Sequence, residues 1–258
     1  MLLSDRVAII TGGARGIGRG IALKFAEQGC TLVIADLLEA QAKKVVEEVS
    51  KKGRDAFFLR CDVADSQQVE DLIDQAIDRF EKIDILVNNA GVGAVPKSIT
   101  ELSEEEWDSV LAINLKGIFL CCREIVPHMK KRGYGRIINI SSMAAIAPPA
   151  PSINYTASKS GVLGLTLDLA LELAQFGICV NVILPGAIRS EMWDPLIPPG
   201  VNPDDFFEEV GKTIAPMQRV GSPDDIAGVA LFLASDLARY VTGDRILVGG
   251  GAPLLKRV

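Results

Sequence analysis

Short apolar runs of strand length alternate with longer helical patterns along nearly all of this 258-residue chain, and this alternation limits the available folds more than any other feature. The runs are VAII from residue 7, TLVIA from 31, AFFL from 56, DILVNN from 84, RIINIS from 136, CVNVIL from 179 and RILV from 245. Helical patterns fill most of the gaps, for example 38–52 and 66–80. Because a strand, a helix and a second strand form a right-handed crossover, we predict an α/β fold whose parallel sheet is covered on both faces.

No repeat, low-complexity tract or linker divides the chain, so we expect a single domain over residues 1–258. The segment LGLTLDLALELA, residues 163–174, has leucine at every second position, which is the period of a strand. Its length and its Ala, Leu and Glu content favour a helix instead. In a helix these leucines point in every direction, and so we expect part of this helix to pack on the sheet and part on another subunit.

The composition argues against several classes of function. A net charge of -6 argues against general nucleic-acid binding, which needs a basic face. No apolar run approaches the ~20 residues that span a bilayer, and the first residues lack the features of a signal peptide. We therefore expect a cytoplasmic protein without a membrane partner. The five cysteines are scattered with no CxxC spacing, which favours reduced core thiols over disulfides or a metal site.

A glycine-rich turn lies between the first strand and the first helix, in VAIITGGARGIGRGIALKFAEQG. Gly12, Gly16 and Gly18 allow the backbone to approach a ligand closely. The helix that follows offers unpaired N–H groups and the positive end of its dipole, which suit a pyrophosphate. The turn therefore predicts a dinucleotide site.

Asp36 ends the second strand and favours NAD(H) as the dinucleotide. A carboxylate at this place accepts hydrogen bonds from the ribose hydroxyls and repels a 2′-phosphate. Arg15 and Arg19 lie beside the glycines and could pair with that phosphate, so NADP(H) remains the alternative.

The stretch NYTASKSG, residues 154–161, places Tyr155 and Lys159 four positions apart, on one face of a helix. Free tyrosine has a pKa of ~10 and is a weak base at neutral pH. Lowering that pKa by about three units needs roughly 4 kcal/mol of preferential stabilisation of the phenolate. A nearby Lys159 ammonium and a positively charged oxidised nicotinamide could supply it, so Tyr155 is a candidate acid or base.

Several motifs occur together in a fixed order. They are TGxxxGxG at 11–18, CDV at 61–63, NNAG at 88–91, AINLKG around Asn114, IINISS at 137–142, the Tyr155 and Lys159 pair, and NVILPG at 181–186. In this order the chain resembles the short-chain dehydrogenase/reductases nearly from end to end. The resemblance implies a Rossmann-type, doubly wound sheet of seven parallel strands that holds a nicotinamide cofactor. It also implies a homotetramer.

The resemblance assigns candidate roles to particular residues. The expected cofactor-binding residues are Gly12, Arg15, Gly16, Ile17, Gly18, Asp36, Asp62, Val63, Asn89, Ala90, Gly91, Tyr155, Lys159, Pro185, Gly186, Ile188 and Ser190. The expected catalytic residues are Asn114, Ser142, Tyr155 and Lys159. Ser142 would orient the substrate oxygen, Asn114 would hold a water that links Lys159 to solvent, and Lys159 would also hold the cofactor ribose. Ser190 stands where threonine is usual and Gly249 where an acidic residue is frequent.

The segment 188–216 is long and rich in proline, and we predict that it forms a lid over the substrate. The expected substrate contacts are Ser142, Met143, Tyr155, Met192 and Trp193. The predicted walls, GAVP from 93 and MAAIAPPAPSI from 143, are small or apolar. We therefore expect an uncharged, fairly apolar secondary alcohol or ketone as the small-molecule substrate.

Two alternatives remain open. The first is a 3-oxoacyl-[acyl-carrier-protein] reductase that uses NADPH, because the basic KKR from residue 130 would suit an acidic carrier; the same KKR before a glycine is also typical of a helix end. The second is a dinucleotide-sensing protein without turnover, which we would expect to lack Tyr155, Lys159 or Ser142.

Overall fold

A seven-stranded parallel sheet forms the centre of the protein in the computed structural model, which describes residues 1–93, 96–148 and 151–252. The strands are β1 (Val7–Thr11), β2 (Thr31–Asp36), β3 (Ala56–Arg60), β4 (Ile85–Asn88), β5 (Gly135–Ile140), β6 (Ile178–Pro185) and β7 (Arg245–Val248). Their spatial order is β3-β2-β1-β4-β5-β6-β7, which confirms the doubly wound prediction. The order reverses between β1 and β4, and a ligand crevice is expected at the carboxyl ends of these strands.

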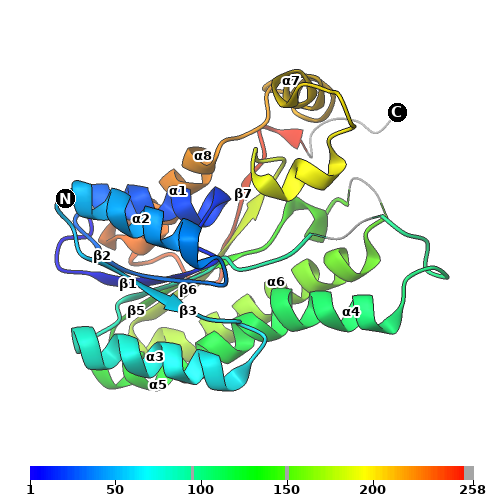
Figure 1. Ribbon diagram of the computed structural model, residues 1–258. Helices are drawn as coiled ribbons and strands as arrows, with labels where there is room; N and C mark the ends of the chain where they lie inside the picture. Colours follow the sequence, from blue (N-terminus) through cyan, green and yellow to red (C-terminus); the bar gives the residue numbers. More distant parts are fainter. Residues whose placement is uncertain (94–95, 149–150, 253–258) are drawn as a thin grey trace.

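Helices cover both faces of the sheet (Figure 1). On one face lie α1 (Gly16–Glu27), α2 (Glu39–Lys51) and α8 (Pro223–Ala234). On the other lie α3 (Ser66–Phe80), α4 (Glu104–Leu111), α5 (Gly117–Arg132) and α6 (Ile153–Leu173). The remaining helix, α7 (Pro203–Ile214), projects beyond the sheet (Figure 1). Strands β1, β4, β5 and β6 are buried along their whole length, which explains their continuous apolar sequences.

A π-helical turn, Ala112–Lys116, separates α4 from α5. It surrounds Asn114, whose side chain is fully buried. Such turns leave backbone groups outside the regular helical ladder and are frequent at functional sites. The α5 helix then ends at Gly133 in the left-handed conformation, with φ of 66°, so the basic KKR is a helix end as its sequence predicts.

The leucine-rich segment is helical and forms the second half of α6, as predicted. Leu163, Leu165 and Leu169 pack against the buried core. Leu167 and Leu171 point outward, with 57% and 83% of their surfaces exposed. The helix therefore has apolar side chains on its solvent side as well as on its core side.

All five cysteines are buried and free. No helix within residues 1–93, 96–148 and 151–252 is long and apolar enough to cross a membrane. In the same ranges no cluster of three or more His, Cys, Asp and Glu side chains is arranged to hold a metal ion.

The amino ends of the central strands are held by a buried carboxylate, Asp84. It accepts a hydrogen bond of 2.9 Å from the Val7 N–H and one of 2.9 Å from Arg132, and it lies 3.6 Å from Arg6. These contacts of Asp84 brace β1 and β4 at the end opposite to the predicted site.

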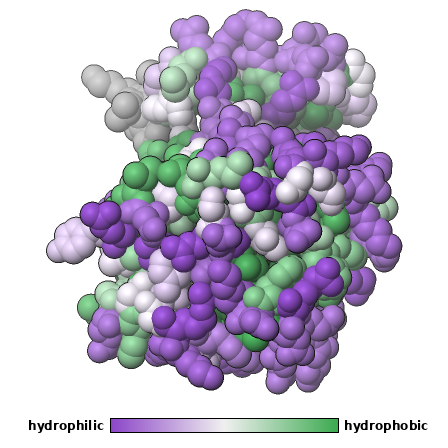
Figure 2. Space-filling view, turned by 90° about the vertical axis from the view of Figure 1, so that its left-hand side faces the viewer, coloured by the Kyte–Doolittle hydropathy of each residue, from purple (hydrophilic) through white to green (hydrophobic). Residues whose placement is uncertain are grey.

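The surface on the amino-terminal side of the molecule is mostly hydrophilic (Figure 2).

Candidate active site

The glycine turn after β1 has no room for side chains. Gly12 has φ of 63°, and a Cβ on it would lie 2.8 Å from the Ala90 Cα. A Cβ on Gly18 would overlap the Gly12 carbonyl oxygen. The α1 helix begins immediately after this turn, at Gly16, with no acidic residue in its first turn and no side-chain cap from Arg15. Its first N–H groups are thus available to an anion, and the turn fits a pyrophosphate.

Asn89 and Thr11 lock this turn to the end of β4. The Asn89 Nδ2 donates to the carbonyl oxygens of Thr11 and Gly12, at 3.0 and 2.9 Å. The Thr11 Oγ1 accepts hydrogen bonds from the N–H groups of Asn89 and Ala90, each of 3.1 Å. The two motifs form one hydrogen-bonded unit, in which Asn89 and Ala90 hold the turn against the end of β4. Thr11 was missing from the predicted site residues, although it begins the TGxxxGxG motif.

Asp36 is held in place by two backbone amides. Its Oδ2 accepts from the Ala14 N–H at 2.9 Å and its Oδ1 from the Leu38 N–H at 3.0 Å. Arg19, one of the two cations that favoured NADP(H), pairs with Glu48 instead. The Arg15 side chain is exposed and forms no hydrogen bond or ion pair with any described residue.

Asp62 and Val63 follow β3 at the same edge of the sheet. The Asp62 N–H donates to the Gln68 Oε1 at 3.0 Å, and the Asp62 Oδ1 accepts from the Ala64 N–H at 3.0 Å. Val63 packs against Gly117, where a Cβ would lie 2.8 Å from the Val63 Cγ2. These bonds fix the loop that carries two of the expected cofactor-binding residues.

Tyr155, Lys159 and Ser142 meet at the carboxyl end of β5. The Ser142 side chain lies close enough to the Tyr155 phenol to lower its pKa. The Lys159 Nζ lies 5.8 Å from the centre of the Tyr155 ring and donates to the Ile140 carbonyl at 3.0 Å. The Lys159 side chain is buried, so its charge acts in a poorly solvated place.

Burial changes the pKa values of both Tyr155 and Lys159. It raises the pKa of Tyr155, an effect that the nearby Ser142 side chain partly offsets. It lowers the pKa of Lys159 to about 8. The expected lowering of the Tyr155 pKa is therefore absent from the protein alone, because desolvation of the phenol dominates. Further positive charge has to come from a bound group.

Asn114 joins this cluster through its side-chain amide. Its Oδ1 accepts from the Val92 N–H at 2.8 Å, and its Nδ2 donates to the Val92 carbonyl at 3.0 Å and to the Ser158 Oγ at 3.2 Å. A Cβ on Gly91 would lie 3.1 Å from the Asn114 Oδ1 and 3.4 Å from the Lys159 Nζ. The four predicted catalytic residues are thus brought together around Gly91.

Ser141 and Ser142 both lie against α6, although consecutive residues of a strand point to opposite sides. The Ser141 Oγ donates to the Lys159 carbonyl at 2.7 Å, while Ser142 contacts Tyr155. Strand alternation does not apply to them because β5 ends at Ile140. Ser142 instead begins the 3-10 helix Met143–Ala145 and accepts from the Ala144 N–H.

The segment 188–216 contains the 3-10 helix Glu191–Leu196 and α7. A Cβ on Gly16 would lie 3.3 Å from the Ser190 Cβ, and one on Gly93 would lie 3.5 Å from the Met192 Cγ. The Trp193 ring packs edge-on against Phe206 and Phe207 of α7. Ser190 thus lies against the glycine turn, Met192 against the predicted wall that begins at residue 93, and Trp193 against α7. Residues 94–95 of that wall and 149–150 of the second lie outside the described residues.

Pro185 and Gly186 follow β6 and lie close to the end of β7. The Gly186 N–H donates to the Val248 carbonyl at 2.9 Å, and a Cβ on Gly186 would lie 2.7 Å from the Gly249 Cα. A Cβ on Gly249 would meet the Met143 Sδ at 3.7 Å, which is ordinary contact. Crowding therefore does not explain why glycine stands at position 249, where an acidic residue is frequent in the family that the sequence resembles.

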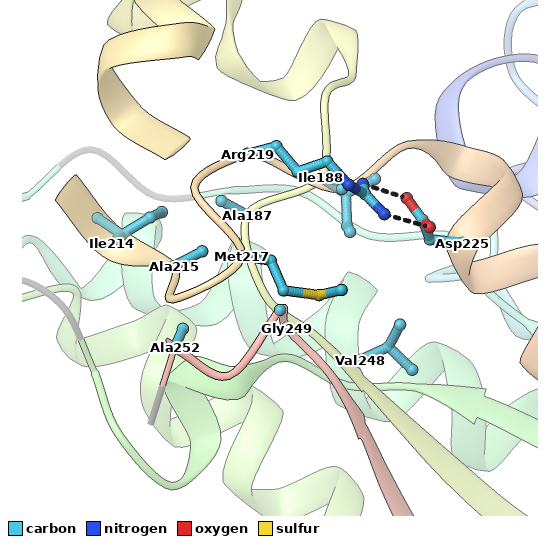
Figure 3. Close-up of a pocket in the computed structure, with 12 residues that line it drawn as sticks. Ala187, Ile188, Ile214, Ala215, Met217, Arg219, Asp225, Val248, Gly249 and Ala252 are labelled. Carbon is cyan, nitrogen blue, oxygen red and sulfur yellow. Dashed lines mark hydrogen bonds and ion pairs between the residues drawn. The ribbon is translucent and has the colours of Figure 1, made fainter. Parts of the chain in front are cut away.

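A pocket lies between Ile188, Met217 and the end of β7 (Figure 3). Its rim carries Arg219, which donates two hydrogen bonds of 2.9 Å to Asp225. Ser142, Tyr155 and Lys159 are not among its lining residues, so the pocket is separate from the cluster around Tyr155. The Ile188 side chain is buried and packs with Gly221.

A family model described as Enoyl-(Acyl carrier protein) reductase matches residues 12–253. The 3-oxoacyl-[acyl-carrier-protein] reductase FabG of Staphylococcus aureus is 41% identical, over 95% of this chain and 96% of its own length. The chain belongs to the short-chain dehydrogenase/reductase family. It is therefore an oxidoreductase that acts on CH–OH groups and binds a nicotinamide dinucleotide.

Other members of the short-chain dehydrogenase/reductase family are also similar over their full lengths. The (2S)-[(R)-hydroxy(phenyl)methyl]succinyl-CoA dehydrogenase subunit BbsD of Thauera aromatica is 40% identical, over 98% of this chain and 99% of its own. The crystal structure of levodione reductase has a TM-score of 0.93 at 33% identity and covers 98% of this chain and 100% of that chain. These relatives differ in the substrates that their names state, so the substrate has to be argued from this chain's own residues.

Proposed function

We propose that this protein is an NAD(H)-dependent oxidoreductase that interconverts an uncharged, fairly apolar secondary alcohol and the corresponding ketone. The observation that carries the proposal is the burial of the Lys159 ammonium with its Nζ 5.8 Å from the centre of the Tyr155 ring, next to the buried Asn114. A purely structural role does not explain a buried ammonium that has no carboxylate partner in the described chain and a phenol next to it.

Tyr155 is the proton-transfer group in this proposal. Its hydroxyl lies close to Ser142, so a substrate oxygen that accepts from both hydroxyls would be held at a defined position. Ser142 orients that oxygen and Tyr155 donates or removes its proton. When bound, the nicotinamide supplies the hydride chemistry, which no side chain can provide.

Lys159 has two functions in this proposal. It can hold the cofactor ribose, because its Nζ has three donors and only one, to Ile140, is used in this structure. Its charge, together with that of an oxidised nicotinamide, lowers the pKa of Tyr155 against the effect of burial. Asn114, within the π-helical turn, would keep a water between Lys159 and solvent.

The preference for NAD(H) rests on Asp36. Two backbone amides fix its carboxylate at the end of β2, next to the glycine turn, where it can accept hydrogen bonds from ribose hydroxyls. The same charge repels a 2′-phosphate. Arg19 cannot compensate while it pairs with Glu48, which leaves Arg15 as the residue that could favour NADP(H).

We propose an uncharged substrate because the cations in or beside the segments predicted to surround it already pair with carboxylates. Arg189 pairs with Asp204, and Lys97 pairs with Glu106. Met192 and Trp193 instead offer apolar surface in the segment 188–216, which we propose as the substrate lid. Met143, which follows Ser142, adds a further apolar contact.

A 3-oxoacyl-[acyl-carrier-protein] reductase is the second candidate, favoured by the 41% identity to FabG. The basic helix end that could bind an acidic carrier is largely neutralised in this chain. Lys130 pairs with Glu172 at 2.6 Å and lies 4.8 Å from the Phe176 ring centre, while Arg132 binds Asp84 at 2.9 Å. We therefore place this activity second.

We also propose that the protein works as a homotetramer. Leu167 and Leu171 on α6 are exposed, and Phe119 on the adjacent helix α5 is 46% exposed. Side chains of this size gain free energy when another apolar surface covers them. A second copy of the chain, with the same helices, offers such a surface.

The proposal is tested by following the absorbance of the reduced nicotinamide with NAD or NADP and a panel of secondary alcohols and ketones. We expect turnover with NAD(H), and a loss of about 10²- to 10⁴-fold in kcat for Tyr155→Phe. Tyr240→Phe, at a fully exposed tyrosine, is the matched control and should keep parental activity.

Each alternative predicts a different result in this assay. Undiminished activity of Tyr155→Phe would overturn the catalytic assignment. Strict dependence on NADPH with acyl-carrier substrates would support the reductase alternative. Dinucleotide binding without turnover across the panel would instead indicate a sensing protein.

A further inference from the structure

Glu191 places a carboxylate at the amino end of α1. It is the first residue of the 3-10 helix Glu191–Leu196, and a Cβ on Gly16 would lie 3.5 Å from its Oε2. Gly16 is the first residue of α1. The Glu191 side chain is exposed and forms no hydrogen bond or ion pair with residues 1–93, 96–148 or 151–252. No bond formed by its own side chain explains its position.

The helix end that Glu191 approaches is the proposed diphosphate site. The first turn of α1 contains no acidic residue, so the Glu191 carboxylate adds a negative charge that this helix otherwise lacks there. A negative charge stabilises a helix amino end when no ligand is present. A diphosphate bound at the same end would instead be repelled by Glu191 across a few ångströms.

We propose that Glu191 sets the affinity for the dinucleotide by opposing its diphosphate, so that the carboxylate must withdraw from Gly16 when the cofactor binds. The inference rests on the proposed cofactor site. Glu191 would weaken cofactor binding, whereas the other residues of the proposed site support it. Because release of a product cofactor limits many enzymes of this kind of architecture, a residue that weakens binding also speeds release.

Movement of Glu191 also affects the substrate side of the site. Its neighbour Met192 lies against Gly93, and Trp193 packs on Phe206 and Phe207. A short helix moves these adjacent side chains together. If the Glu191 carboxylate withdraws by movement of this helix rather than by side-chain rotation, Met192 and Trp193 shift with it, and cofactor binding is coupled to the apolar cover of the substrate.

The test measures the Kd of two probes by calorimetry on the full chain. ADP-ribose carries the diphosphate, and adenosine lacks it. In Glu191→Gln we expect the Kd of ADP-ribose to fall about tenfold, the order expected for one screened unit charge at this distance, and the Kd of adenosine to stay within about twofold. The gain for ADP-ribose should shrink as salt is added, because the interaction is electrostatic.

Asp194→Asn is the matched control. Asp194 lies in the same 3-10 helix, is exposed and forms no side-chain bond with the described residues, so its loss removes the same charge away from Gly16. An equal gain in Asp194→Asn, an equal gain for adenosine, or an unchanged Kd of ADP-ribose in Glu191→Gln would each overturn the inference alone. Failure of the parental protein to bind ADP-ribose would overturn the proposed function, and the inference with it.

The coupling has a separate readout in Trp193 fluorescence. Trp107→Phe leaves Trp193 as the only tryptophan of the chain. In this background we expect ADP-ribose to change the emission of Trp193, and adenosine to leave it nearly unchanged. An identical response to both probes would contradict the movement that we propose for Glu191.

Discussion

The Asn114 Nδ2 and the Ser158 Oγ are joined by a hydrogen bond of 3.2 Å between two fully buried side chains. The Ser158 Oγ in turn donates to the Tyr155 carbonyl at 2.7 Å. One hydroxyl therefore connects the π-helical turn to the turn of α6 that carries both Tyr155 and Lys159. We interpret Ser158 as a positioning residue for the catalytic cluster.

Ser158→Ala should reduce kcat about tenfold and destabilise the protein by about 1–3 kcal/mol, because the Asn114 amide loses a buried partner. The cofactor Kd should stay close to the parental value, since Ser158 does not face the glycine turn. Steady-state kinetics on the folded fraction, together with denaturant unfolding, measure these effects. Ser160→Ala is the control: its hydroxyl donates to the Ala145 carbonyl and does not contact Asn114. An unchanged kcat in Ser158→Ala would contradict the positioning role.

Lys159 should make the stability depend on pH in a defined window. Its pKa is about 8 in the folded chain and 10.5 as a free group, so the unfolded state binds more protons between these values. Stability from this group therefore rises with pH through that window, and below it the buried ammonium costs about 3 kcal/mol. Lys159→Met should be inactive yet more stable than the parent near neutral pH, with the difference narrowing toward pH 10.5. Denaturant unfolding across this range tests the prediction, and a constant difference would contradict it.

Gly18→Ala should abolish dinucleotide binding and impair folding, because the added methyl group would overlap the Gly12 carbonyl oxygen. Gly228→Ala, in the interior of α8, is the comparison, since no atom lies within 4 Å of a Cβ at that position. That variant should be stabilised by up to about 1 kcal/mol through helix propensity. Thermal unfolding with and without NAD measures both effects. Normal NAD binding by Gly18→Ala would show that the turn is wider than the structure indicates.

Two substitutions in α7 should distinguish the contribution of buried aromatic packing from that of an exposed ion pair. Phe207 is buried and contacts both Trp193 and Phe206, so Phe207→Ala should destabilise α7 by roughly 3–5 kcal/mol and raise the KM for apolar substrates. Asp204→Asn removes the partner of Arg189, but both side chains are more than half exposed, so the change in stability should be below about 1 kcal/mol. Limited proteolysis of the segment 188–216 and substrate kinetics measure the two effects. Equal damage from both variants would contradict this interpretation.

Local patterns were sufficient to predict the sheet and the glycine turn. The seven apolar runs correspond to β1–β7, because the strands of a parallel sheet that is covered by helices are rich in apolar residues. Gly12 could be identified from its sequence context, since a positive φ and a close backbone approach exclude other residues. Tyr155 and Lys159 could be proposed from their spacing, whereas Asn114 and Ser142 could be named only through the order of motifs along the chain, which a known family shares.

Contacts between distant segments could not be predicted in this way. The bond between Asn114 and Ser158, the pairing of Lys130 with Glu172 and the approach of Glu191 to Gly16 each join parts of the chain that local periodicity does not relate. The pKa of Tyr155 is a further property that local spacing did not predict. The spacing of Tyr155 and Lys159 predicted a lowered tyrosine pKa, whereas burial raises it in the folded chain.

The amino-acid sequence by itself determined the order of strands and helices, the glycine turn and the residue types available for catalysis, because these depend on backbone conformation and side-chain period over short distances. Only the tertiary structure decided which charges are neutralised, which hydroxyls meet and how strongly Tyr155 and Lys159 are desolvated. Those properties depend on what each side chain contacts after folding, and electrostatic energy varies steeply with both distance and burial.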